Sequence, residues 1–120
     1  MSLVERLQAA LTPAMRARDG AAVAALRSAL AAVANAEAVP APERTGSSLA
    51  IGPGTALGAG GAEAVRRELT DDDVRGIVSA EVAERHDAAE SYDRLGRAQQ
   101  AAQLRAEAAV LAAHLDAAAS

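Results

Sequence analysis

Residues 69–96 read LTDDDVRGIVSAEVAERHDAAESYDRLG, and this stretch decides the fold. Its opening predicts a helix start, because the Thr70 hydroxyl can accept from the Asp73 amide while the Asp73 carboxylate accepts from the Thr70 amide. Three aspartates in the first turn also suit the positive end of the helix dipole. At the far end, Gly96 is the residue type that stops a helix in the left-handed conformation. The stretch therefore predicts one long helix over residues 71–94.

Apolar residues at three-and-four spacing predict three more helices, over residues 2–18, 21–38 and 98–117. The turn signal Asp19-Gly20 separates the first two, and an equally short break separates the last two. Because both connections are short, the helices of each pair must lie antiparallel. The expected fold class is all-α, with two antiparallel helical hairpins forming a small four-helix bundle. The sequence leaves open the alternative that the two hairpins pack at an angle.

Pro13 interrupts the first of these helices. Inside a helix, proline removes one backbone hydrogen bond and clashes with the preceding turn, so a kink is expected at this point. Alternatively, Thr12 caps a new segment in which Pro13 takes the first helical position. The sequence leaves both arrangements open.

Residues 40–61 hold three of the four prolines and six of the nine glycines, with no helical or alternating period. This composition predicts a long, flexible crossover between the two hairpins of a single domain spanning residues 1–120. The glycines match neither the spacing of a phosphate-binding loop nor that of a dinucleotide fingerprint, and no lysine follows them. A phosphate-binding role is therefore not expected for this segment.

Alanine supplies 35 of the 61 hydrophobic residues, so the helices are strongly encoded while the core is thin. A domain of this size with so little large apolar surface is expected to be only marginally stable by itself, which favours a protein partner or a homo-oligomer. Residues 62–120 carry seven arginines against twelve acids. A phosphate backbone would repel that half, so no DNA partner is expected and direct tRNA binding is disfavoured.

The N-terminal residues predict a cytoplasmic protein. Charged side chains at Glu5 and Arg6 and the lack of a long apolar run argue against a signal peptide. No stretch offers the roughly 18 uninterrupted apolar residues of a membrane-spanning helix, so no membrane partner is expected.

No catalytic, cofactor-binding or metal site is expected. Cysteine is absent, which removes thiolate chemistry. His86 and Glu90 lie four residues apart and could in principle share a metal, but such sites need three or four convergent ligands, so a solvated histidine is favoured. Tyr92 is the single aromatic residue, and its surroundings favour a plug at the core or its rim.

Several short pieces, taken in order and spacing, resemble the N-terminal helical domain of the GatB/YqeY family. They cover most of the chain outside the Gly/Pro-rich segment. The pieces are Ala25-Leu26-Arg27, Asn35-Ala36-Glu37, Leu69-Thr70-Asp71-Asp72-Asp73-Val74, Glu81, Arg85, Tyr92, Leu95-Gly96-Arg97, and Leu104 with Glu107, Leu111 and Leu115.

The resemblance implies a non-catalytic helical accessory module linked to tRNA-dependent amidotransferase systems, which are glutamine amido-N-donor carbon–nitrogen ligases. Any amidase or kinase chemistry would then reside in other polypeptides. The alternative is a protein-interaction or self-association module with no tRNA role. The polar positions that match the family pattern are Arg27, Asn35, Glu37, Glu81, Arg85, Tyr92 and Arg97. From the residues alone, we expect them to lock helix pairs through buried hydrogen bonds rather than to bind a ligand.

Two departures from the family pattern matter for the tRNA link. The last helix carries His114-Leu115-Asp116 where family members usually have an aromatic residue followed by Leu-Pro. The chain also stops at Ser120, before the second, tail-like domain through which the link to tRNA mainly runs. Direct tRNA binding is therefore not expected of this chain.

Overall fold

The computed structural model describes residues 1–38 and 68–119, so the predicted crossover at 40–61 lies outside the described residues. Those two ranges contain four helices and no strand. The all-α prediction is therefore confirmed. The helices are α1 (Leu3–Arg16), α2 (Gly20–Ala38), α5 (Asp71–Arg94) and α6 (Ala98–Ala119).

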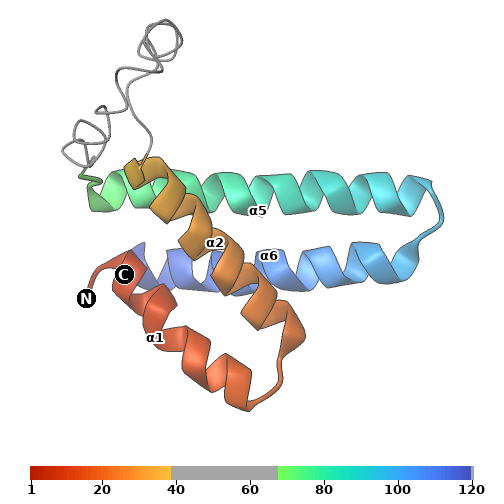
Figure 1. Cartoon of the computed structure of the whole chain (residues 1–120). Coiled ribbons are helices and arrows are strands. Elements are labelled where there is room, and N and C mark those ends of the chain that lie inside the picture. Colours follow the sequence, from red (N-terminus) through yellow and green to blue (C-terminus); the bar gives the residue numbers. More distant parts are fainter. Residues whose placement is uncertain (39–67, 120) are drawn as a thin grey trace, which may run out of the picture.

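The helices form two antiparallel hairpins that pack across each other at an angle (Figure 1). Helix α2 crosses the α5–α6 pair obliquely and contacts α6 more extensively than α5. In Figure 1 both chain termini lie at the left, the α5–α6 turn lies at the right, and the α1–α2 turn lies at the bottom. The α5–α6 pair is the longer hairpin and projects beyond the region that α2 crosses.

Two capping boxes start the first helix of each hairpin. The predicted box at α5 is confirmed: Thr70 Oγ1 accepts from the Asp73 amide at 3.1 Å, and Asp73 Oδ2 accepts from the Thr70 amide at 3.0 Å. A second box, which our sequence analysis did not identify, joins Ser2 and Glu5 in the same reciprocal way. Each box satisfies amide groups that a helix start otherwise leaves without partners.

The turn between α1 and α2 differs from its prediction. Gly20 is the first residue of α2, and the left-handed residue is Arg18, with φ of 56°. Asp19 caps α2, accepting from the Ala22 amide through Oδ1 at 3.1 Å. Because the chain reverses at Arg18, α1 ends at Arg16 rather than at residue 18. The other turn is as predicted, with Gly96 at φ of 75°.

Helix α1 continues through Pro13, so the alternative in which Thr12 starts a new segment is wrong. Proline has no N–H to donate, but the Pro13 carbonyl still accepts from the Ala17 amide at 2.9 Å. Pro13 is exposed, so its ring does not displace the core. The helix therefore tolerates the missing hydrogen bond near its C-terminal end.

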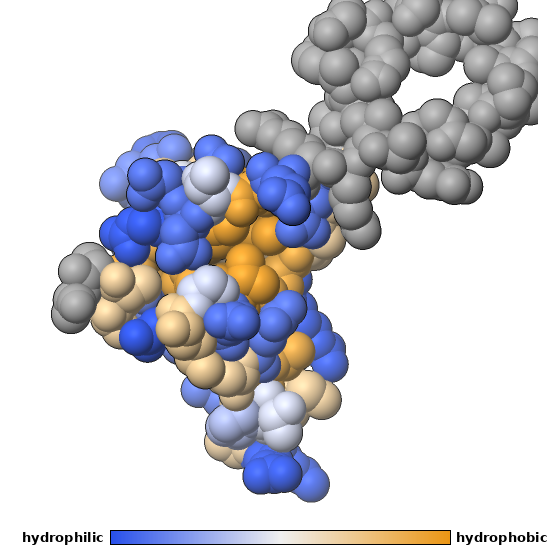
Figure 2. All heavy atoms as spheres, turned by 90° about the vertical axis from the view of Figure 1, so that its left-hand side faces the viewer, coloured by the Kyte–Doolittle hydropathy of each residue, from blue (hydrophilic) through white to orange (hydrophobic). Residues whose placement is uncertain are grey.

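The core lies where the two hairpins cross, and every helix contributes to it. Its buried members are Leu3, Leu7, Ala25, Leu26, Ala29, Val33, Val74, Val78 and Leu111. Figure 2 views the end that holds the termini and shows hydrophobic side chains among hydrophilic ones, so the core is not fully closed at that end. By length and composition alone, α2 could cross a membrane. That is weak evidence for a span, because a core helix passes the same test.

Beyond the crossing, α5 and α6 contact mainly each other. We call this projecting part, residues 88–105, the arm. Its buried residues are the small Ala89 and Ala101, which let the two helix backbones approach closely. The arm therefore presents most of its larger side chains to solvent.

Candidate functional site

An arginine between two carboxylates forms the most buried polar cluster in the described part of the chain. Arg85 on α5 forms an ion pair with Glu81, one turn earlier on the same helix, with 2.8 Å between Nη1 and Oε1. Its Nε donates to Oε1 of Glu107 on α6 at 3.0 Å. The same Nη1 also lies 3.1 Å from the Glu81 carbonyl oxygen. One guanidinium therefore ties α5 to α6 and closes a turn of its own helix.

Two further side chains extend this cluster in opposite directions. Ser28 on α2 donates from Oγ to Oε1 of Glu81 at 2.8 Å. Gln103 on α6 donates from Nε2 to Oε2 of Glu107 at 3.0 Å. The five residues, which we call the polar network, therefore link α2, α5 and α6.

The polar network is largely shielded from water. The side chains of Arg85 and Glu107 are each 11% exposed, and that of Glu81 is 16% exposed. Burial by itself lowers the pKa of Arg85, but hydrogen bonds and attraction from Glu81 and Glu107 more than offset it, so the net shift is upward. Both carboxylates therefore favour the charged form that arginine ordinarily has in proteins.

The polar network is suited to holding helices rather than to catalysis. Both carboxylates are occupied by donors, and the cluster includes no histidine or lysine that could act as a base. Removing these charges from water is costly, and their attraction and hydrogen bonds offset that cost only while every partner is present, so removing one partner leaves an uncompensated buried charge. The arrangement therefore specifies how α2 and the α5–α6 hairpin fit together.

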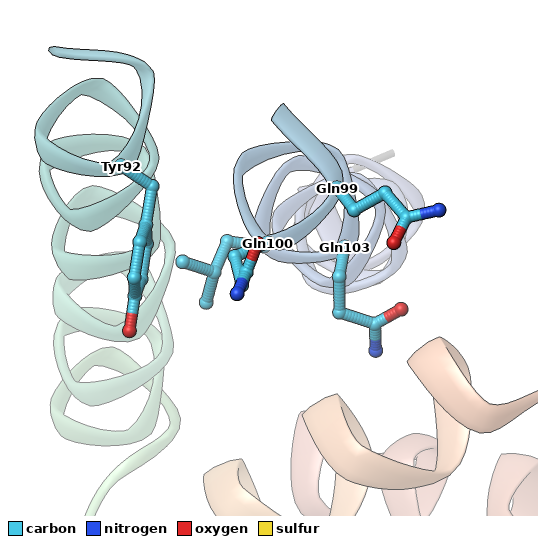
Figure 3. Close-up of a pocket in the computed structure, with 5 residues that line it drawn as sticks. Tyr92, Gln99, Gln100 and Gln103 are labelled. Carbon is cyan, nitrogen blue, oxygen red and sulfur yellow. The ribbon is translucent and has the colours of Figure 1, made fainter. Parts of the chain in front are cut away.

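An open groove of about 310 Å³ lies next to the network, on the arm. It is lined by Tyr92, Gln99, Gln100, Gln103 and Leu104. Figure 3 shows the Tyr92 ring on α5 lying alongside α6, with the glutamine side chains on α6. Gln103 belongs to both features, so the groove borders the buried charges directly.

The structure brings together only part of the predicted set of polar residues. Glu81 and Arg85 meet in the polar network, and Tyr92 lines the groove beside it. Arg97 is exposed in the turn before α6. Three of the seven predicted residues are therefore neighbours on one hairpin.

The other predicted residues lie apart, on α2. Arg27 is exposed, with Nη2 4.0 Å from the Met15 sulfur, which is a weak contact. Asn35 and Glu37 lie near the C-terminal end of α2, exposed and half-buried respectively. Among the described residues, neither makes a side-chain hydrogen bond.

Ser28 and Gln103 were missed as site residues, and Glu107 was named only within the family pattern. Glu107 left a signal, because it lies three residues after Leu104 and four before Leu111, within the apolar stripe of α6. A charged residue at a core-facing position indicates a buried partner, and Glu107 is 9% exposed. Ser28 and Gln103 carried no such signal, since both residue types are common on helix surfaces.

The structure gives the histidines no shared site. His86 is exposed on α5, and the described residues contain no group of three or more potential ligands that could hold a metal ion. His114 lies half-buried on α6. Burial, followed by the nearby charge of Arg6, lowers the pKa of this histidine.

The fold and the network define a small two-hairpin helical protein whose buried charges hold its helices together. A family model described as "Yqey-like protein" matches residues 60–120, and the chain therefore belongs to the YqeY-like family. The matched region includes α5 and α6, which carry most of the network and the whole groove. Neither the search of curated proteins nor that of solved structures gave a match.

Proposed function

We propose that this YqeY-like chain is a non-catalytic accessory module that binds a protein of a tRNA-dependent amidotransferase system. The observation that carries the proposal is the saturation of the buried charges. Arg85, Glu81 and Glu107 occupy one another, which leaves no free acid or base poised for chemistry in that cluster. The link to glutamine-dependent carbon–nitrogen ligases rests on the family resemblance.

The architecture supports a binding role in a second way. The polar network joins α5 to α6 at the base of the arm, while the arm carries the groove and presents it to solvent. A rigid projecting element lets a partner bind without paying for ordering of the surface. Direct contact with tRNA is not part of the proposal, because acids outnumber arginines in residues 62–120.

Biolayer interferometry on the immobilised full chain tests this proposal. A purified tRNA-dependent amidotransferase should bind at micromolar concentration or tighter, whereas bulk tRNA should not bind at physiological salt. The chain alone should release no ammonia from glutamine. Lack of binding to the amidotransferase would reject the link. Ammonia release that is abolished by Glu81→Gln would reject the non-catalytic role.

Self-association is the second candidate, favoured by exposed apolar side chains at the two hairpin turns. Leu95 is 68% exposed and Met15 is 48% exposed. Because the core is thin and rich in alanine, burying further apolar surface between two copies of the chain would add stability. Light scattering over a dilution series separates the two functions, since only self-association gives a mass that rises with concentration. A cytoplasmic location remains part of both proposals and is checked by imaging a tagged chain.

A further inference from the structure

We propose that the groove and tip of the arm form a docking surface for an acidic, amphipathic helix of a partner protein. The inference deepens the proposed function, on which it rests, by assigning the surface and the chemistry of its partner. It is carried by three features of the arm: an apolar groove, an exposed leucine at the tip, and Arg97, an arginine whose charge the fold does not use.

The apolar part of the surface comes from three side chains. Tyr92 and Leu104 line the groove from α5 and α6 and are both half-buried. Leu95, three residues after Tyr92, lies at the tip with 68% of its surface exposed. Amphipathic helices bind such grooves through residues at three-and-four spacing, so a groove with a neighbouring leucine offers places for successive anchors.

The charged part of the surface is positive although the chain as a whole carries −4. The arm holds three arginines against two acids, Glu90 and Asp93. Asp93 is paired with Arg105 at 2.6 Å, which leaves Arg94 and Arg97 without an acidic partner among the described residues. An acidic helix would supply the missing negative charge.

The positive charge of Arg97 is not explained by helix stability. Its carbonyl oxygen accepts from the Ala101 amide at 3.2 Å, which makes it the residue that precedes the first turn of α6. Side chains that accept hydrogen bonds are preferred there, and acids rather than arginines suit that end of the dipole. The first turn of α6 contains no acid to compensate. Arg97 therefore suits a negative partner better than it suits its own helix.

A protein segment fits this surface better than a nucleic acid does. The groove has one aromatic side chain, whereas sequence-tolerant binding of single strands uses several stacked rings along a basic channel. Burying the exposed Leu95 against apolar side chains of a protein is favourable, whereas a phosphate backbone offers no apolar surface to bury it. Gln99 and Gln100, also on the rim, can donate to the carboxylates of an acidic helix.

Peptide display with the full chain as bait tests the inference without using the amidotransferase. The probe is a random library of peptides of about 16 residues, roughly four helical turns. Enriched sequences should be acidic, with apolar residues at three-and-four spacing. The best peptide, labelled and measured by fluorescence polarisation, should bind about tenfold more weakly to Leu95→Ser and to Arg97→Glu. Its affinity should also fall between about 50 mM and about 500 mM salt.

Arg16→Glu is the matched control, because it makes the same charge change at the other hairpin turn, outside the groove lining. It should leave peptide affinity within about twofold of the parent. Leu95 and Arg97 are both exposed, so the Leu95→Ser and Arg97→Glu variants should fold. Thermal unfolding verifies this. If the peptide binds but the amidotransferase does not, the amidotransferase link fails and the surface stands.

Several results of these experiments would overturn the inference by showing that the surface binds something else or nothing. Absence of enriched peptides, enrichment of basic ones, or equal loss in Arg16→Glu would each count against it. Binding of bulk tRNA that Arg97→Glu abolishes would assign the surface to nucleic acid. A concentration-dependent dimer that Leu95→Ser disrupts, with no peptide bound, would assign it to a second copy of the chain.

Discussion

Arg85 on α5 and Glu107 on α6 are joined across the hairpin at 3.0 Å, with both side chains only 11% exposed. Arg85 lies three residues before the arm on α5, and Glu107 lies two residues after it on α6. The pair therefore fixes the register of the two helices at the base of the arm. Each member of the pair has a second partner, because Arg85 also donates to Glu81 and Glu107 also accepts from Gln103.

Removing one member of this pair should be strongly destabilising. We expect Glu107→Ala to lower the free energy of unfolding by about 3 kcal/mol, because buried Arg85 then loses both a compensating charge and the hydrogen-bond acceptor of its Nε. Urea titration followed by circular dichroism measures the change. Glu107→Gln, which retains an acceptor, should cost clearly less. Equal losses in the two variants would show that charge rather than hydrogen bonding holds the hairpin.

The two left-handed turn residues should respond in opposite directions. Arg18→Gly should stabilise the protein by about 1 kcal/mol, because a side chain at φ of 56° is strained and glycine is not. Gly96→Ala should destabilise it by about 1 kcal/mol for the same reason, although a Cβ there would meet no atom within 4 Å. Thermal unfolding of both variants checks the pair. The same sign in both would contradict the assignment of these turns.

The capping box of α5 gives a third prediction. Thr70→Ala removes the acceptor for the Asp73 amide and should cost about 1 kcal/mol. Thr12→Ala is the matched control, since Thr12 is exposed within α1. There alanine is the better helix former, and the change should be neutral or slightly stabilising. Chemical denaturation of the two variants provides the comparison.

Stability should fall on mild acidification because of His114. Burial and the charge of Arg6 lower its pKa in the folded state, so the unfolded chain binds a proton at higher pH than the folded chain does. The stability that neutral His114 contributes is fully present above its unfolded-state pKa of about 6.5. It is lost progressively as the pH falls below that pKa. His114→Gln should flatten this part of the curve of stability against pH.

Arg6→Gln serves as the control for that experiment. It removes the second cause of the shift while leaving His114 in place, so the slope should decrease without vanishing. Urea midpoints at a series of pH values measure the slope, and proton NMR of the histidine follows the titration directly. A steeper slope in His114→Gln than in the parent would contradict the sign of the effect.

Local signals in the sequence predicted the four helices and their pairing. The capping box at Thr70 and the helix end at Gly96 depend on neighbouring residues in the sequence. They can therefore be predicted without knowing how the helices pack. The turn at Arg18 could not be predicted, because an arginine in the left-handed conformation has no sequence signal. Asp19-Gly20 pointed to the correct place but to the wrong residue.

The candidate site was harder to predict than the fold. Glu81 and Arg85 lie four apart on one helix, a local relationship that a sequence displays. Their connection to Ser28 and Glu107 depends on how α2 and α6 pack against α5, which no local pattern specifies. The groove likewise exists only because Tyr92 and Leu104, from different helices, come together at the arm.

We assign a structural role to the buried charges and the binding role to the arm, and one comparison tests both assignments. Binding to the amidotransferase is measured by biolayer interferometry for the parent, for Glu107→Gln and for a Leu95→Ser/Arg97→Glu variant. We predict that Glu107→Gln, although less stable, binds like the parent, while the arm variant stays folded and binds at least about tenfold more weakly. Loss of binding in folded Glu107→Gln, with the arm variant unchanged, would contradict the account.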